Sequence, residues 1–253
     1  MSGDKIIGVI PARYASSRLP GKPLVDIHGK TMIQWVYENA SRAALPDRII
    51  VATDDDRIVE AVESFGGQAL MTPESLASGT DRVAHVSGLF QADIWINIQG
   101  DEPFIEPEEV DQVAKILTDD LDAVMGTLVK RITDVDELLN PNTAKVVVDE
   151  KMNALYFSRS PIPYFRDENN PVQWISSHCY FKQVGIYSFR DSFLKKITEW
   201  DVSSLEKTEK LEQLRILEKG YRIKLAETEY DPVCIDTQED LERVRKMVIQ
   251  KTV

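Results

Sequence analysis

The sequence is poor in cysteine and histidine and has no long apolar stretch. Only two of its 253 residues are cysteine and three are histidine, and Cys179 and Cys234 do not form a CxxC pair. This argues against a disulfide framework or a zinc–thiolate site and favours a reducing cytoplasm, with both cysteines as small core residues. The longest apolar runs, such as 6–10, fall far short of the roughly 18 residues that a membrane span needs. No apolar segment follows the basic residue near the N-terminus, so neither a secretory signal nor a membrane partner is expected.

Two common phosphate-binding motifs are missing as well. The chain has no GxGxxG, and a Walker loop would need glycine at Ser16 and serine or threonine at Pro23. The net charge of −12 makes nucleic acid a poor partner, because an acidic surface repels a phosphate backbone. Residues 1–36 are different, with five basic side chains against two acidic ones. Such a local cationic segment indicates a small anionic ligand.

The first half of the chain alternates short apolar runs with helical patterns. Strands are predicted at Lys5–Pro11, Arg48–Ala52, Ala69–Met71 and Ile94–Ile98. Helices are predicted at 32–43, Asp55–Phe65, Thr80–Leu89 and Pro107–Thr118. This alternation is typical of a parallel sheet covered by helices on both faces.

The second half is less regular and contains loops rich in proline and asparagine. Strands are predicted at Ala123–Val129, Ala144–Val148, Ala154–Phe157 and Val184–Phe189. Helices are predicted at Leu205–Leu217 and from Thr237 onward, the last one burying Leu241, Val244 and Val248. We therefore predict one α/β domain over 1–253, with an inserted, mostly antiparallel portion at roughly 130–220.

The loop PARYASSRLPGKPL at 11–24 follows the first predicted strand and carries three cations, Arg13, Arg18 and Lys22. In an open parallel sheet, ligands bind beyond the carboxyl ends of the strands. Side-chain charge and loop amides at that place can hold a triphosphate. A solvated basic loop is the alternative, and the position directly after the strand favours the phosphate clamp.

A second candidate site is NIQGDEP at 97–103, at the end of another predicted strand. Asp101 could there bridge a hard cation to substrate phosphates, because Mg²⁺ prefers one or two carboxylates together with phosphate oxygens. Asp236 is its candidate partner, although an aspartate before a helix is also an ordinary helix cap. The run Asp54–Asp56 is better explained as acids at a helix start.

The full set of motifs resembles the 3-deoxy-manno-octulosonate (Kdo) cytidylyltransferase family over nearly the whole length. Its members share, in this order, the segments PARYASSRLPGKPL (11–24), ATDD (52–55), SGTDR (78–82), QGDEP (99–103), NPNTAKVV (140–147), YFSRSPIP (156–163), GIY (185–187), KLEQLR (210–215) and DTQEDL (236–241). The resemblance implies a Rossmann-like nucleotide-diphospho-sugar transferase fold that dimerises through its inserted portion. It also implies that CTP and Kdo, an acidic eight-carbon sugar, react to CMP-Kdo and pyrophosphate with Mg²⁺, for lipopolysaccharide synthesis.

The resemblance assigns roles to individual residues. It implies that Asp101 and Asp236 ligate magnesium and act in catalysis together with Arg13 and Lys22. The residues that it places around the nucleotide are Ala12, Arg13, Arg18, Lys22, Ser78, Thr80, Arg82 and Gln99. The residues that it places around the sugar are Arg159, Gln183, Tyr187, Glu212 and Gln213. Arg159 would grip the sugar carboxylate with two parallel N–H groups, which lysine cannot do.

One position departs from the family pattern, which leads us to expect histidine where Gln183 stands. An amide keeps hydrogen bonding but has no cationic form. A Kdo variant with an amino group in place of a hydroxyl, such as 8-amino-3,8-dideoxy-manno-octulosonate, is therefore an alternative substrate. Less favoured alternatives are a nucleotide-sugar glycosyltransferase, for which Asp101 lacks a DxD context, and a catalytically silent binding protein.

Overall fold

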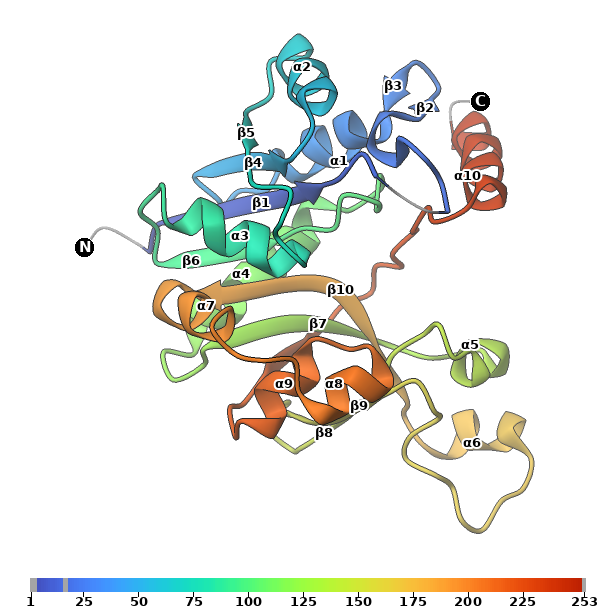
Figure 1. Ribbon diagram of the computed structural model, residues 1–253. Coiled ribbons are helices and arrows are strands. Elements are labelled where there is room, and N and C mark those ends of the chain that lie inside the picture. Colours follow the sequence, from blue (N-terminus) through green and yellow to red (C-terminus); the bar gives the residue numbers. More distant parts are fainter. Residues whose placement is uncertain (1–3, 16–17, 252–253) are drawn as a thin grey trace.

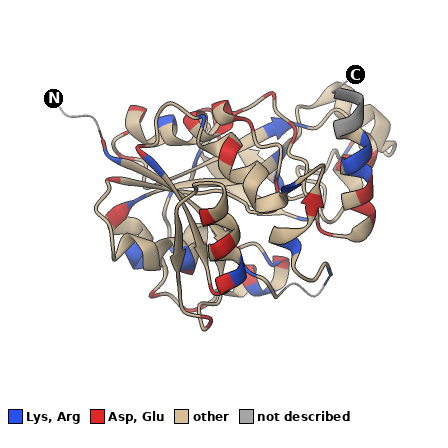
Figure 2. Ribbon diagram, turned by 90° about the horizontal axis from the view of Figure 1, so that it is seen from above, with Lys and Arg blue, Asp and Glu red and all other residues tan. Residues whose placement is uncertain are grey.

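The computed structural model describes residues 4–15 and 18–251, with side chains up to residue 247. Within these residues the chain forms a nine-stranded mixed sheet in the order β11-β7-β10-β6-β1-β4-β5, with β8 and β9 attached through β10 (Figure 1). Helices cover both faces of this sheet. Asp and Glu are spread over most of the helices (Figure 2).

The parallel half of the sheet has the strands and helices that the sequence predicts. Its strands β1 (Ile6–Ala12), β4 (Arg48–Thr53), β5 (Ala69–Met71) and β6 (Ile94–Asn97) pair in parallel. Its helices are α1 (Met32–Ala40), α2 (Asp56–Ser64), α3 (Gly79–Ser87) and α4 (Pro107–Asp119). The small hairpin β2 (Asp26–Ile27) and β3 (Lys30–Thr31) lies before α1.

The antiparallel part begins where β10 (Phe181–Arg190) pairs with both β6 and β7 (Met125–Arg131). The hairpin of β8 (Lys145–Val148) and β9 (Ala154–Ser158) continues it, and β11 (Lys224–Glu227) adds a parallel edge strand beside β7. The predicted strands of this part are confirmed, whereas β11 was not expected. The segment of α5 (Val135–Leu139) and α6 (Pro171–Ser177) extends away from the sheet (Figure 1).

Alternate residues of the central strand divide the core into two clusters. Ile6 and Ile10 of β1 join the cluster that contains buried residues of α1 and α4. Ile7 and Val9 join the cluster that contains residues of α3, α7 (Asp191–Ile197) and α9 (Gln213–Glu218). Because successive side chains of a strand point to opposite faces, this division shows that β1 is covered on both sides. Its carboxyl end is thereby held in a rigid frame.

The single helix predicted at 205–217 was wrong, because the chain forms two helices there. The capping box of Ser203 and Glu206 starts α8 (Ser204–Glu209), and Lys210 ends it in the left-handed conformation, at φ 55° and ψ 45°. Helix α9 begins only at Gln213. The apolar spacing persists across the break because Leu211 and Leu214 are both buried, so hydrophobic periodicity alone could not reveal it.

The last helix, α10 (Gln238–Lys251), buries Leu241 and Val244 as predicted, and the side chain of Val248 lies outside the described residues.

The prediction that both cysteines are core residues was wrong, because Cys179 and Cys234 are both exposed. Across residues 4–15 and 18–251, no helix is long and apolar enough to span a membrane.

Candidate active site

The carboxyl ends of the neighbouring strands β1 and β6 form the floor of the site. Their parallel register places Val9 beside Asn97, so the loops that follow leave the sheet side by side. Gly100 allows these loops to approach, since a Cβ at this position would lie 2.8 Å from the Pro11 carbonyl oxygen. Gly21, at φ 67°, turns the first loop into the short helix Lys22–Leu24. The loops therefore converge because two glycines permit contacts that a side chain would block.

Lys22 joins the two carboxylates that the sequence analysis named as metal ligands. Its Nζ lies 2.7 Å from Asp101 Oδ2 and 2.9 Å from Asp236 Oδ1. Arg18 approaches the same Asp236 at 3.1 Å. The segment before α10 reaches this place because the Ile235 amide donates to the Asp101 carbonyl at 3.0 Å. Although burial opposes it, the charges of Asp101 and Asp236 raise the pKa of the Lys22 ammonium.

Asp236 is not the cap of the following helix, which was its alternative explanation. The Thr237 hydroxyl accepts from the Asp240 amide at 3.2 Å, while the Asp240 carboxylate accepts from the Thr237 amide at 3.1 Å. The carboxylate of Asp236 therefore remains directed at Lys22 and Arg18. Asp55, in contrast, caps α2 as predicted, by accepting from the Arg57 amide at 3.0 Å.

An open cleft lies above these groups. Eight of the residues predicted from the sequence line it, namely Ala12, Arg13, Arg18, Lys22, Arg82, Gln99, Asp101 and Asp236. The Arg13 guanidinium donates to the Leu76 carbonyl and thereby holds the loop before α3 against the cleft. The cleft has four cationic side chains against two carboxylates, so it favours a polyanionic ligand.

The innermost cation of the cleft is Arg82, which is fully buried. It pairs with Asp54 and donates to the Thr72 hydroxyl. Its Nε, like the Oδ1 of buried Asn97, has no hydrogen-bond partner among the described protein atoms. Both residues line the cleft, and buried polar atoms without partners indicate that a ligand or water completes the site. Asn97 was not predicted as an individual site residue. The assignment of Asp54 to the helix start was wrong, because its carboxylate pairs with Arg82 while Asp55 caps α2.

A second, narrower pocket adjoins the cleft through α3. It contains Tyr187, Glu212 and Gln213, which were predicted to contact the sugar. It also contains Ser78 and Thr80, which were predicted to contact the nucleotide but do not line the cleft. The Thr80 hydroxyl donates to Glu212 at 3.0 Å, which connects α3 to the start of α9. Gln213 Nε2 donates to Gln183 Oε1 at 2.5 Å, so Gln183 belongs to the same group although it departs from the family pattern.

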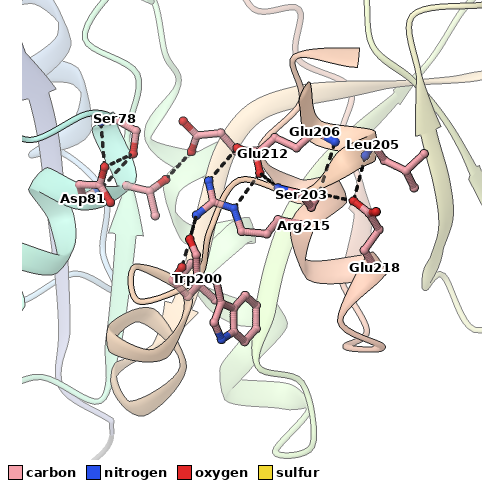
Figure 3. A network of polar contacts seen from close by, with 11 residues as sticks. Ser78, Asp81, Trp200, Ser203, Leu205, Glu206, Glu212, Arg215 and Glu218 are labelled. Carbon is pink, nitrogen blue, oxygen red and sulfur yellow. Dashed lines mark hydrogen bonds and ion pairs between the residues drawn. The ribbon is translucent and has the colours of Figure 1, made fainter. Parts of the chain in front are cut away.

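The charges of this second pocket are mostly neutralised. The Nε atom and one terminal nitrogen of Arg215 each donate to the Glu206 carboxylate at 2.7 Å (Figure 3). The other terminal nitrogen donates to the Trp200 carbonyl at 3.1 Å. Burial raises the pKa of Glu212, and burial together with the Glu212 charge raises the pKa of Tyr187. The pocket therefore presents hydroxyl, amide and carboxyl groups, which suit a polyhydroxylated ligand.

Arg159 is placed differently from the expectation. It lines neither pocket, and its guanidinium donates to the backbone carbonyls of Glu209 at 2.7 Å and Pro141 at 3.0 Å. The structure thus brings together all the residues predicted for the site except Arg159, which lies behind the turn that carries Glu212.

Asp101 and Asp236 fit a magnesium ion by the chemistry of their surroundings. Among residues 4–15 and 18–247, no cluster of three or more His, Cys, Asp or Glu side chains is arranged to hold a metal. Two carboxylates, however, are enough for Mg²⁺ when phosphate oxygens and water complete its octahedron. The ammonium of Lys22 between them is a stand-in cation. Burial and the charge of Asp101 raise the pKa of the neighbouring Glu102 to about 8.

Known proteins resemble the chain over nearly its whole length. The profile of the Cytidylyltransferase family matches residues 7–224. The 3-deoxy-manno-octulosonate cytidylyltransferase of Geotalea uraniireducens is 50% identical over 95% of this chain and 97% of its own. The enzyme of the same name from Syntrophus aciditrophicus is 47% identical over 97% and 98%.

A solved structure supports the same relationship. A CMP:2-keto-3-deoxy-manno-octonic acid synthetase complexed with CTP superposes with a TM-score of 0.91, at 45% identity, over 98% of this chain and 99% of that one. A cytidylyltransferase from Leptospira borgpetersenii shares the fold at 17% identity and a TM-score of 0.65. With its cation-lined cleft at the strand ends and these relatives, the chain belongs to the cytidylyltransferase family, and within it to the 3-deoxy-manno-octulosonate cytidylyltransferases.

Proposed function

We propose that the protein transfers the cytidylyl group of CTP to the anomeric hydroxyl of Kdo, forming CMP-Kdo and releasing pyrophosphate. The observation that carries the proposal is the convergence of Lys22, Asp101 and Asp236 at the carboxyl ends of β1 and β6, below a cationic cleft. The names of the relatives supply the substrates. Lipopolysaccharide synthesis is the pathway that we propose for the product.

The cleft would bind the nucleotide. Of the residues that line it, Arg13, Arg18 and Lys22 would face the triphosphate, while Ala12, Gln99 and Arg82 would surround the cytidine. Attack on the α-phosphate is a phosphoryl-type transfer, in which positioning and neutralisation of charge carry most of the catalysis. The loop cations therefore have to stay aligned with the phosphates as pyrophosphate departs.

Asp101 and Asp236 would hold Mg²⁺. When bound, the ion neutralises phosphate charge and promotes loss of the proton from the attacking hydroxyl. Lys22 has to leave the two carboxylates before they can ligate the metal, and its long side chain can then turn to the phosphates. We therefore propose that Lys22 pairs with Asp101 and Asp236 in the empty cleft, and that the two carboxylates bind Mg²⁺ when nucleotide is present.

The adjoining pocket would bind the sugar through Tyr187, Glu212, Gln213 and Gln183. The amino-sugar alternative is not favoured, since the relatives at about half identity are named for manno-octulosonate. The amide of Gln183 is already engaged by Gln213, which gives it a role without an ammonium ligand. We therefore propose Kdo itself as the acceptor.

We propose a cytoplasmic homodimer that associates through the inserted portion. The support is the apolar surface that this portion exposes, where Leu155, Tyr164 and Val172 are 61%, 68% and 57% exposed. Large apolar side chains that stay exposed are found at interaction surfaces. The oligomeric state can be measured by light scattering.

Release of pyrophosphate tests the proposed reaction. Purified protein with CTP, Kdo and Mg²⁺ should release pyrophosphate and form CMP-Kdo, whereas UTP or ATP should replace CTP poorly. The 8-amino analogue should react with a lower kcat/KM than Kdo. Absence of pyrophosphate with CTP and Kdo would end the proposal, and hydrolysis of a CMP-sugar or transfer from it would indicate a glycosyltransferase instead.

A further inference from the structure

Three segments are joined next to the turn that carries Glu212 and Gln213, namely the loop 140–143, the backbone at Arg159 and the end of α8 at Glu209. The buried Lys145 connects the first two of them. Lys145 of β8 has no exposed surface. Its Nζ donates to the carbonyls of Asn140 at 2.8 Å, Thr143 at 2.7 Å and Arg159 at 2.5 Å. A buried ammonium is stable only when its donors are satisfied, and here three carbonyls satisfy them. Lys145 thereby ties loop 140–143 to the backbone at Arg159.

The side chain of Arg159 connects the same loop to the third segment. Its Nε donates to the Glu209 carbonyl at 2.7 Å, and one terminal nitrogen donates to the carbonyls of Pro141 at 3.0 Å and Asn142 at 3.4 Å. The other terminal nitrogen lies 3.4 Å from the Lys210 carbonyl. A two-pronged grip on a carboxylate needs two parallel N–H groups, and these contacts leave no such pair free.

The third segment is also held through Glu209. Its carboxylate accepts from the Ser158 hydroxyl at 2.7 Å and from the Arg159 amide at 2.9 Å. The next residue, Lys210, adopts the left-handed conformation, which is unfavourable for a residue with a side chain. Such a turn persists only when its surroundings determine it. The contacts from Arg159 and Ser158 supply that constraint.

This turn decides where the sugar-pocket side chains point. After Lys210, the buried Leu211 anchors the chain, and Glu212 then reaches Thr80 while Gln213 reaches Gln183. We infer that Arg159, whose backbone carbonyl is held by Lys145, is a positioning residue that keeps the 209–213 turn in the geometry that binds the sugar acid. The inference rests on the proposed function of the pocket. Recognition of the sugar carboxylate then falls to other groups, and Arg159 acts through the backbone.

Two sugar substrates, one with and one without the carboxylate, show whether Arg159 positions the 209–213 turn or contacts the sugar carboxylate directly. We compare Kdo with its carboxamide in wild type and Arg159→Gln, and we measure CTP binding separately by calorimetric titration. The KM for both sugars should rise about tenfold or more in the variant, the affinity for CTP should change less than twofold, and the preference for the acid should stay within threefold of wild type. Collapse of that preference by tenfold or more would mean that Arg159 touches the carboxylate and would overturn the inference.

Arg190 offers a matched control. Its guanidinium also donates to three backbone carbonyls, those of Ala123, Leu117 and Asp120, and it lies outside both pockets. Arg190→Gln should leave the KM for Kdo unchanged. An equal rise of this KM in Arg190→Gln would show that loss of any such arginine merely loosens the fold, and would also overturn the inference.

Milder variants keep the test decisive if Arg159→Gln does not fold. Arg159→Lys retains a charged donor and should recover part of the loss, while Glu209→Gln should raise the KM for Kdo about threefold without affecting CTP. An unchanged KM in both would refute the positioning role. Failure of the proposed function is separate, because wild-type protein would then release no pyrophosphate from CTP and Kdo.

Discussion

Replacing Lys22 with methionine should make the protein without nucleotide bind a divalent cation more tightly. The ammonium lies 2.7 and 2.9 Å from Asp101 and Asp236 and occupies the place that we propose for Mg²⁺. A metal ion must displace it before both carboxylates become available. Methionine is unbranched like lysine and only one atom shorter, and it removes the competing charge.

The size of the effect follows from the two contacts. A hydrogen bond to a charged group contributes about 1.5–3 kcal/mol when well protected, whereas exposed ion pairs contribute about 0–1 kcal/mol. The carboxylates are 27% and 36% exposed, so we take about 0.5–1 kcal/mol for each contact. Their sum, about 1–2 kcal/mol, corresponds to roughly 5- to 30-fold in affinity.

Binding of Mn²⁺, followed by electron paramagnetic resonance without nucleotide, measures this affinity. Lys22→Met should bind Mn²⁺ roughly 5- to 30-fold more tightly than wild type and should bind CTP more weakly. Lys30→Met is the control for net charge, because Lys30 pairs with Glu38 at the surface. An affinity for Mn²⁺ equal to or below that of wild type would refute the competition between Lys22 and the metal.

Three further predictions concern the strand ends and the acid–base behaviour of the fold. Asp101→Asn should lower kcat at least about 100-fold while the affinity for CTP changes little, because the metal acts mainly on the transition state; a near-normal kcat in a pyrophosphate assay would remove Asp101 from the mechanism. Gly100→Ala should lower CTP affinity and thermal stability together, because its Cβ would lie 2.8 Å from the Pro11 carbonyl oxygen, and normal calorimetric titration of CTP would contradict this. Burial raises the pKa of Glu109 above its ordinary value of 4.5, so the native state retains a proton that the unfolded chain releases, and stability falls as the pH rises from 4.5 through the native pKa. Glu109→Gln should remove this fall, and urea denaturation at pH 4 and pH 8 should show a gain over wild type only at pH 8.

Local patterns were sufficient for most of the framework. The apolar runs at 6–10 and 94–98 predict buried strands, and the structure contains β1 and β6 there. Hydrophobic periodicity is a property of neighbouring residues, so it survives without knowledge of the fold. It fails at Lys210, where the apolar spacing continues while the backbone changes its handedness.

In the site, too, some residues follow from local sequence patterns and others depend on the tertiary structure. The position of Arg13, Arg18 and Lys22 directly after β1 already indicates an anion-binding loop, since the sheet topology places strand ends at the ligand. Arg159, in contrast, has the side chain that a carboxylate grip requires, but its donors go to four backbone carbonyls. Only the surrounding loops determine which acceptors a guanidinium finds.

By itself, the sequence determined the class of the fold, the cationic loop and the carboxylates that could hold a metal, because these follow from residue type and local spacing. The tertiary structure alone decided that Lys22 lies between Asp101 and Asp236, which are 79 and 214 positions away along the chain. It also decided that Lys145 and Arg159 donate to backbone carbonyls of neighbouring loops. Contacts over such separations depend on how strands pair and loops close, and neither is encoded in a local pattern of residues.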